Sequence, residues 1–258
     1  MRNNSTWAPS AVSPTLWLPD AWPIGRAILV AIGIALLYVG PPSLYLIVAA
    51  LFHAIDPRHP LQSPEQLLIA QLFGYVPVAM FVLASLPRLS RTSLGNLGLR
   101  APTLRAIGIG ALGTVVMWLL VTLASALIFK LTRRHDTENA IALLQQMKGV
   151  VDKIAFFVLA CVFAPMIEEL IFRVFLFNAL TRYVSTTAAI VVSGLVFGLV
   201  HALGAPAAQL VTVSIPLAIG GMVLAYVYAT THNYWANVTT HGLFNSISVI
   251  AIFVFHAK

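Results

Sequence analysis

Charged residues are scarce in this chain. Only 9% of its 258 residues are charged, and 59% are hydrophobic. A soluble domain carries about 25% charged residues, so this composition excludes an ordinary soluble protein and favours a membrane protein. The chain also has a single cysteine, Cys161. One cysteine excludes an intrachain disulfide, and it leaves the redox compartment undetermined.

Several other patterns are missing. The apolar runs lack the alternation of apolar and polar residues that marks the strands of a membrane β-barrel. They must therefore be helices, because lipid cannot satisfy exposed backbone N–H and C=O groups. With no internal repeat, low-complexity tract or long linker, residues 1–258 are predicted to form a single membrane domain. Its polar segment 1–25 has no short apolar core before a cleavage site, so we expect no removable signal peptide.

Seven apolar runs approach or exceed the length of about 20 residues that a helix needs to cross a bilayer. Two of them come from one uncharged stretch, which Gly204-Ala205-Pro206 divides. We therefore predict an all-α, polytopic membrane bundle. Its spans are 27–52, 66–86, 106–129, 154–180, 187–203, 209–230 and 234–255. Gly40-Pro41-Pro42 should kink or break the first span, which leaves an eighth, partial pass open.

The net charge of +7 lies in the predicted loops. It indicates contact with anionic lipid headgroups and no binding of nucleic acid. A seven-span arrangement places Arg2, Arg26, Arg88, Arg91, Arg100, Arg105 and Arg182 on one side, and Arg58, Lys130, Arg133, Arg134, Lys148, Lys153 and Lys258 on the other. Because the two counts are equal, the positive-inside rule leaves the orientation in the membrane undecided.

The polar stretch before the fourth span has an amphipathic pattern. Asp136 or Thr137 could cap a short helix, in which Ile141, Leu144 and Met147 recur at three-residue spacing. We expect this segment to lie along the membrane interface. A solvated loop is the alternative.

Three charged residues interrupt the fourth span, which costs about 2.5 to 3.5 kcal/mol for each residue at the bilayer centre and usually marks a functional site. Glu169 and Arg173 are four residues apart, so they should share a helix face and form a pair. Glu168 should point about 100° away and stay unpaired. A low dielectric disfavours the ionised form of such a carboxylate, which suits a general base near neutral pH. A structural charge cluster that holds helices together is the alternative.

Three polar residues in later spans are candidates for the same site. They are His201, His241 and Asn245, the last two four residues apart and on one helix face. Measured from one membrane face, Glu168 and His241 lie about 21 Å deep, Asn245 about 15 Å and His201 about 8 to 10 Å. Helix tilt can absorb such differences, so four polar groups from three helices could meet at one buried point. Taken singly, each could equally bridge helices.

Three motifs resemble a known family. EELIFR, FGLVH and HGLFN match, in order, the EExxxR, FxxxH and HxxxN motifs of the CPBP family, the CAAX-processing and bacteriocin-processing intramembrane proteases, also called the Abi family. The connector RTSLGNLGLR resembles that family's loop less specifically, and the likeness is concentrated in residues 164–250. It implies a type II CAAX prenyl endopeptidase-like hydrolase, with 154–255 as its catalytic core. Such an enzyme would cut near the C-terminus of prenylated proteins, or within membrane-associated peptides.

The resemblance also implies roles for the candidate residues. Glu168 and His201 would activate a water molecule that attacks the scissile carbonyl, while His241 and Asn245 would stabilise the oxyanion. The family is classed with metalloproteases, and a catalytic zinc normally takes three protein ligands. Zn²⁺ held by Glu168, His201 and His241 is therefore expected. A metal-free glutamate mechanism stays open, because the chain has no HExxH motif.

Two other functions are weighed against proteolysis. A proton-coupled transporter could use the buried glutamates and histidines as a relay, but transporters often show internal repeats, and none is visible here. An immunity factor or scaffold that needs no catalysis is less consistent with all four motif residues being present. The peptide substrate, the need for a prenyl group and the oligomeric state are not determined by the sequence. From the compact length and the lack of an organelle address we expect a prokaryotic inner membrane.

Overall fold

The structure is a computed structural model that describes residues 22–54, 64–134, 144, 147, 149–203 and 205–255. All regular elements in these residues are helices. The long ones are α1 (Ile24–Leu51), α2 (Pro64–Ser90), α3 (Leu104–Thr132), α8 (Thr186–His201), α9 (Leu210–Thr231) and α10 (Tyr234–Phe255). One further rod is built from α5 (Val150–Val158), η3 (Leu159–Phe163), α6 (Ala164–Glu169), η4 (Leu170–Phe177) and α7 (Asn178–Leu180). Two short 3₁₀ helices are η2 (Leu94–Leu97) and η5 (Ala207–Gln209).

The seven predicted spans correspond to these helices. Six are long and apolar enough to cross a membrane, and α8 is a shorter apolar helix of 16 residues. The segment around Pro206 separates α8 from α9, as the sequence indicated, and contains η5. The predicted all-α, polytopic membrane bundle is therefore confirmed, and the chain is a multi-pass membrane protein.

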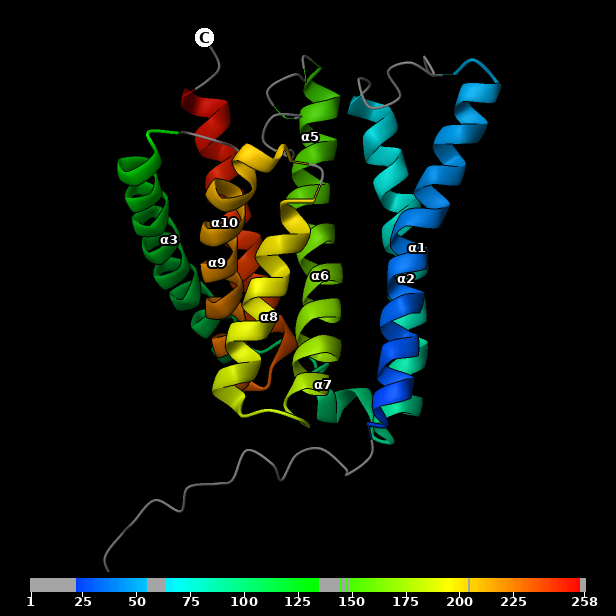
Figure 1. Cartoon of the computed structure of the whole chain (residues 1–258), viewed down its shortest axis with the longest axis vertical. Coiled ribbons are helices and arrows are strands. Elements are labelled where there is room, and N and C mark those ends of the chain that lie inside the picture. The colour runs from blue at the N-terminus through cyan, green and yellow to red at the C-terminus, as the bar shows by residue number, and fades with distance from the viewer. Residues whose placement is uncertain are drawn as a thin grey trace, which may run out of the picture.

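The first helix continues through its prolines. Pro41 and Pro42 lie inside α1, which has 28 residues, so the predicted break is wrong and α1 is a single pass. Figure 1 shows α1 and α2 diverging in the half of the pair that lies beyond these prolines. A proline removes one backbone hydrogen bond of a helix, and the neighbouring hydrogen bonds can remain. This explains why the helix bends without breaking.

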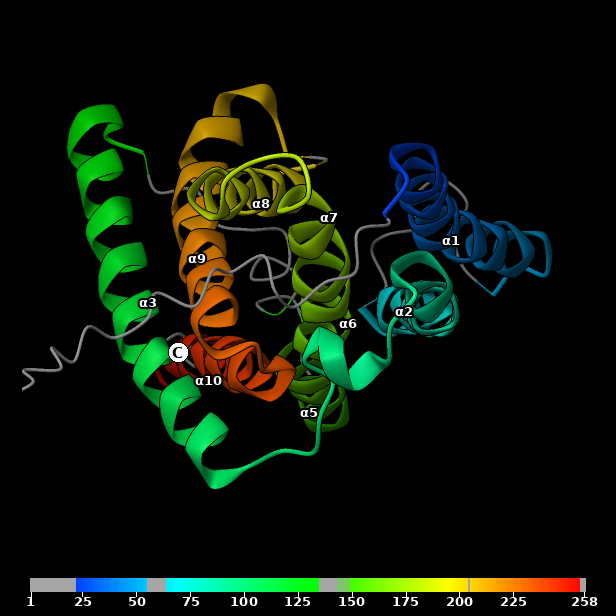
Figure 2. The same ribbon diagram turned by 90° about the horizontal axis from the view of Figure 1, so that it is seen from below.

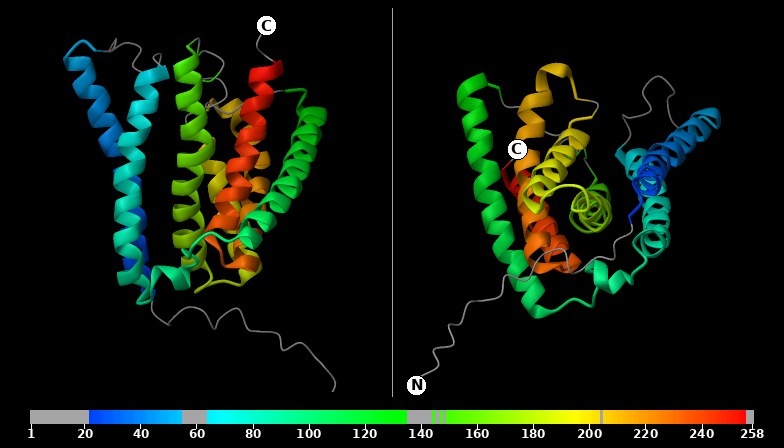
Figure 3. Two further views of the ribbon diagram at one scale, coloured as in Figure 1. Left: turned by 180° about the vertical axis from the view of Figure 1, so that it is seen from behind. Right: turned by 60° about the horizontal axis from the view of Figure 1, so that its bottom comes forward.

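Successive helices run in opposite directions and form two groups (Figure 1). Seen from below, α1 and α2 make a pair at one side, while α3, α8, α9, α10 and the α5–α7 rod form a second group (Figure 2). From behind, α3 runs obliquely along the edge of the second group and lies next to α10 (Figure 3). The residues proposed for catalysis all come from this second group.

Small residues allow the closest helix contacts, as is common between membrane helices. A Cβ atom added to Gly198 of α8 would lie 2.3 Å from the backbone oxygen of Ser214 in α9. A Cβ atom added to Gly113 of α3 would lie 2.7 Å from Oγ1 of Thr240 in α10. These glycines bring α8 against α9 and α3 against α10.

The connector between α2 and α3 is fixed to the α9–α10 turn. The Tyr228 hydroxyl donates to the backbone oxygen of Leu97 (2.8 Å), and Trp235 Nε1 donates to that of Arg100 (2.8 Å). Between them, Gly98 adopts a left-handed conformation (φ +85°), and an added Cβ would lie 2.9 Å from the His232 carbonyl oxygen. The loop that resembled the family's loop therefore holds the connector between α2 and α3 against α9 and α10.

Part of the predicted interfacial segment can be placed. Leu144 and Met147 are buried in one apolar cluster with Phe156, Cys161 and Val249. Asp136, Thr137 and Ile141 lie outside the described residues. The predicted cap and interfacial helix therefore remain predictions.

The α8–α9 contact can be tested with two glycine substitutions. Gly198→Ala should destabilise the fold by about 1 to 3 kcal/mol, because the new methyl group overlaps backbone atoms of α9. The control is Gly108→Ala in α3, where nothing lies within 4 Å of the added Cβ, and where better helix propensity adds stability of about 1 kcal/mol at most. Thermal unfolding in detergent measures both, and equal Tm values would contradict the close contact.

Candidate functional site

Glu169 is a fully buried carboxylate with three partners. Its Oε2 lies 3.2 Å from Arg173 Nε and accepts a hydrogen bond from Asn237 Nδ2 (2.9 Å). Its Oε1 lies 2.9 Å from Nδ1 of His241. A buried charge is costly unless it is paired and hydrogen-bonded, and both oxygens of Glu169 are engaged. The predicted Glu169–Arg173 pair is therefore present.

Arg173 and Asn237 extend this cluster to α9. Arg173 is also fully buried, and its Nη2 donates to the backbone oxygen of Gly221 (2.9 Å). Its guanidinium carbon lies 4.9 Å from the ring centroid of Phe197, a distance suitable for a cation–π interaction. Asn237 Nδ2 also donates to the backbone oxygen of Leu224 (2.7 Å). The cluster thus connects the α5–α7 rod to α8, α9 and α10.

Glu168 faces two imidazole rings. Its Oε2 lies 3.3 Å from His201 Nε2 and 3.8 Å from His241 Nε2, and its Oε1 accepts a hydrogen bond from the Tyr75 hydroxyl (3.4 Å). Oε2 accepts no hydrogen bond of good geometry from the described residues. The Glu168 side chain is 13% exposed, whereas Glu169 is fully buried. Glu168 is therefore the carboxylate that a small molecule could reach.

The partners of each ring indicate where its proton lies. Nδ1 of His201 lies 2.8 Å from the backbone oxygen of Phe197, which can only accept, so this Nδ1 carries hydrogen. Nδ1 of His241 faces the carboxylate of Glu169, which is paired with an arginine, so it carries hydrogen as well. Both rings consequently direct Nε2 toward Glu168.

This arrangement requires a positive centre between the groups. A neutral ring with hydrogen on Nδ1 has a lone pair on Nε2. A lone pair and a carboxylate oxygen 3.3 Å apart repel each other unless a proton or a cation is shared between them. Glu168 and His201 can thus hold and transfer a proton at a single position.

Phe197 orders the rings. Its ring centroid lies 4.2 Å from that of His201 and 5.6 Å from that of His241. The side chain is 2% exposed, and it also contacts the guanidinium of Arg173. The FxxxH motif thus supplies the carbonyl that orients His201 and the aromatic ring that packs against it.

Asn245 has a different partner. Its Nδ2 donates to the backbone oxygen of Ala160 in η3 (2.8 Å), and it makes no hydrogen bond to the Glu168 or Glu169 clusters within the described residues. One turn earlier, a Cβ added to Gly242 would lie 2.7 Å from the backbone oxygen of Cys161. Asn245 therefore holds α10 against η3, and its role at the oxyanion remains a prediction.

Both π-helical segments, η3 and η4, adjoin α6, which carries the two glutamates. Short π-helical segments are rare and often occur at functional sites. The segment η4 is followed by Asn178, whose Nδ2 donates to the hydroxyl of Tyr228 (2.8 Å). The apolar pattern of the predicted span 154–180 indicated a regular α-helix, so the π-helical segments were not predicted.

The donor types at this site suit zinc. Two imidazoles with Nδ1 engaged and Nε2 available, together with a carboxylate, make a His₂Glu set like those of catalytic zinc sites, with the hydrogen bonds to Nδ1 orienting the rings. Within the described residues, however, no three His, Cys, Asp or Glu side chains are arranged so that they could hold a metal ion. Glu168, His201 and His241 therefore remain the predicted ligands of a metal ion.

Two residues of this site, Asn237 and Tyr75, were not predicted from the sequence. Asn237 lies four residues before His241, so the spacing that grouped His241 with Asn245 could also have found it. Tyr75 lies within the apolar α2, where hydropathy gives no sign of a partner. Only the packing of α2 against α6 brings its hydroxyl to Glu168.

The part of the chain that forms this site resembles known proteins. Residues 150–247 match the Rce1-like type II CAAX prenyl endopeptidase family. The Rce1-like segment includes all six predicted site residues. The chain is also similar to a Bacillus subtilis protein named "Putative membrane peptidase YdiL", with 29% identity over 116 residues, which cover 45% of this chain and 43% of that protein. No solved structure matches the chain.

The buried Glu169–Arg173 pair can be tested by its effect on stability. Arg173→Met should lower the free energy of unfolding by about 3 to 5 kcal/mol, because it leaves the Glu169 carboxylate buried without its cation. The control is Arg105→Met, an exposed position where changes of about 0.5 kcal/mol or less are typical.

The stability of Arg173→Met and of the control Arg105→Met is measured by thermal unfolding in detergent. Glu169→Gln combined with Arg173→Met should recover part of the lost stability, since no isolated charge then remains. If Arg173→Met were as stable as the control, the pair would not hold the helices together.

Proposed function

We propose that the protein is an intramembrane endopeptidase. It hydrolyses a peptide bond near the C-terminus of a prenylated, CAAX-type protein, or within a membrane-associated peptide. The observation that carries this proposal is the Glu168 carboxylate faced by Nε2 of both His201 and His241. The match of residues 150–247 to the Rce1-like family supports it, as does the name of the bacterial relative.

Glu168 acts as the general base in the first step. A water molecule beside its Oε2 transfers a proton to the carboxylate while its oxygen attacks the carbonyl carbon of the substrate. The carbonyl π electrons move to oxygen, which gives a tetrahedral oxyanion. Proton transfer to a positioned side chain contributes about 10²- to 10⁴-fold to the rate. The low exposure of Glu168 and His201 limits the site to little water, which strengthens electrostatic interactions within it.

The imidazole rings act on the oxyanion. A ring in its imidazolium form, with a proton on Nε2 as well as on Nδ1, donates this Nε2–H toward the developing negative charge, and one such donor is worth about 3 to 4 kcal/mol. The buried Glu169 fixes the orientation of His241, so this donor needs no reorganisation during the reaction. Asn245 is proposed as a further donor, which requires its amide to leave the Ala160 carbonyl.

Collapse of the oxyanion completes the reaction. The carbonyl forms again as the C–N bond breaks, and the proton taken up by Glu168 passes to the leaving amine nitrogen. The products are a carboxylic acid and an amine, and Glu168 returns to its starting state. If zinc is bound by Glu168, His201 and His241, it supplies Lewis-acid activation of the attacking water.

The catalytic role of Glu168 can be tested by substitution. Glu168→Gln keeps the size of the side chain but removes the base, so kcat for cleavage should fall at least about 100-fold while Tm changes little. The assay uses purified protein in detergent with matched prenylated and unprenylated peptides. Asp152→Asn, outside the site in the first turn of α5, is the control and should retain wild-type kcat. Cleavage by Glu168→Gln at the wild-type rate would remove the catalytic assignment.

Metal dependence is a separate prediction. If Glu168, His201 and His241 bind zinc, a strong zinc chelator should lower cleavage at least about 10-fold and added Zn²⁺ should restore it, because two histidines and a glutamate are donor types of catalytic zinc sites. The zinc content of the purified protein gives a readout besides activity, and it should fall in His201→Ala and His241→Ala. Full activity after chelation, with no zinc retained, would leave the metal-free glutamate mechanism.

A further inference from the structure

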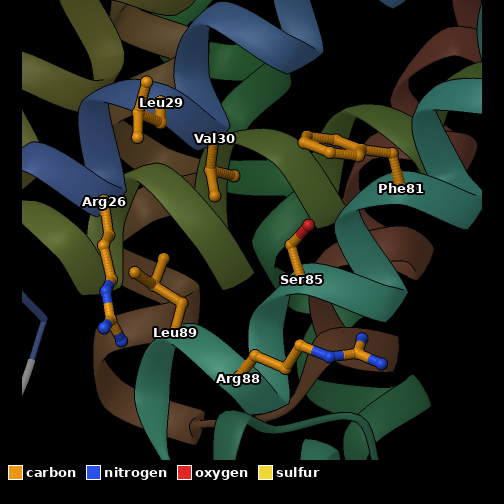
Figure 4. A pocket seen from close by; sticks show the side chains of 7 residues that line it. All are labelled: Arg26, Leu29, Val30, Phe81, Ser85, Arg88 and Leu89. Atoms are coloured by element: carbon orange, nitrogen blue, oxygen red, sulfur yellow. The ribbon is translucent and has the colours of Figure 1, made fainter.

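A cavity lies between α1 and α2, apart from the Glu168 site. It has a volume of about 300 Å³. Its lining is apolar apart from two arginines and a serine (Figure 4). The lining residues are Arg26, Leu29 and Val30 from α1, and Phe81, Ser85, Arg88 and Leu89 from α2.

The shape of the α1–α2 contact explains the cavity. A Cβ added to Gly33 would lie 2.5 Å from the ring of Phe81, so this ring lies directly on α1 and closes the inner end of the cavity. Below this contact Ser85 is small and half-buried, so space remains between the helices. Arg26 and Arg88 lie near the ends of their helices, at the membrane face where α1 begins and α2 ends.

Arg26 and Arg88 have no acidic partner among the described residues. Both side chains are exposed, and neither forms an ion pair within the described part of the chain. Arg88 Nη1 donates to the backbone oxygen of Ala84, which leaves further N–H donors on that guanidinium. Two cations beside one cavity, without an acid, provide donors for an anion.

The membrane face at which α1 begins and α2 ends is rich in arginine in its described part. By the direction of the helices it carries Arg26, Arg88, Arg91, Arg100, Arg105 and Arg182. No Asp or Glu occurs among the described residues at this face. The opposite face includes the acid Asp152. An anion is therefore attracted to this face, and the cavity between α1 and α2 gives it a specific position.

We propose that this cavity binds the phosphate headgroup of an anionic membrane lipid. Arg26 and Arg88 bind the phosphate, and the apolar side chains above them contact the first carbons of the acyl chains. The exposed outer surface of α1, which includes Leu29 and Leu36, continues this apolar contact into the membrane. Basic sites between membrane helices are a known way of binding anionic headgroups.

The lipid site is distinct from the proposed catalytic centre. Tyr75 of α2 contacts Glu168, and Arg88 follows thirteen residues later, which is about 20 Å along the helix at 1.5 Å per residue. None of the lining residues contributes a contact to the Glu168 or Glu169 clusters. A bound lipid would instead stabilise the α1–α2 pair, and through Tyr75 this pair adjoins the site.

Native mass spectrometry of the purified protein in detergent tests this proposal. The probes are phosphatidylglycerol, which is anionic, and phosphatidylcholine with the same acyl chains, which has no net charge. Phosphatidylglycerol should bind more tightly. Arg26→Gln combined with Arg88→Gln should weaken its binding about 30-fold, since each interfacial arginine contributes about 5-fold.

Two controls separate a site from a general charge effect. Arg91→Gln combined with Arg105→Gln removes the same charge from the same face outside the cavity, and should leave phosphatidylglycerol binding within about twofold of wild type. Ser85→Phe keeps both arginines but fills the cavity, and should also lose the lipid. Each variant is first checked for a wild-type Tm.

Three outcomes would overturn the proposal. They are equal binding of the two lipids, equal loss in the control pair, and unchanged binding by Ser85→Phe. A further experiment adds inorganic phosphate in excess to the protein with bound phosphatidylglycerol. Phosphate should not displace the lipid, because it lacks the acyl chains, and complete displacement would identify a site for free phosphate instead.

Discussion

The compensation of one buried charge organises the second group of helices, α3, α8, α9, α10 and the α5–α7 rod. Glu169 has no exposed surface, and its carboxylate is matched by Arg173, Asn237 and Nδ1 of His241. In hydrocarbon none of these partners could be replaced by water. The same contacts set the position of other parts: Arg173 contacts Phe197, and Phe197 orients His201. One ion pair thus fixes both rings that face Glu168.

This arrangement assigns different tasks to adjacent acids. Glu169 is enclosed and orients its neighbours, whereas Glu168 keeps a small exposed surface and an oxygen without a well-formed hydrogen bond. Removal of the first is expected to lower stability, whereas the second is the proposed general base. The opening of the site is formed partly by another group of helices, since Tyr75 belongs to the α1–α2 pair. That pair also shares a buried apolar core with the α5–α7 rod, in which Val78 and Val82 of α2 pack with Val174 of η4, so changes in its position would be transmitted to the rod through packing as well as through the Tyr75 hydroxyl.

The sequence predicted the membrane helices well, because bilayer thickness imposes a minimum apolar length that can be read directly. It also predicted the Glu169–Arg173 pair, since the i,i+4 spacing is a local property. It did not predict the contacts of Tyr75 or Asn237, which depend on how separate helices pack. The partner of Asn245 differs from expectation for the same reason: α10 approaches η3 closely at Gly242, and the amide reaches a backbone carbonyl there. The continuity of α1 through two prolines shows that a proline pattern predicts a bend more securely than a break.

The π-helical segment η4 has a consequence for the length of the chain. A π turn holds more residues than an α turn, so η4 includes additional residues between the glutamates and α7. If all of residues 170–177 wound as a regular α-helix, with none removed, everything beyond them would be rotated relative to α6. Asn178 would then face away from Tyr228, even though every named side chain of the site would still be present. The number of residues in this stretch, and not their identity alone, sets the alignment of the two ends of the rod.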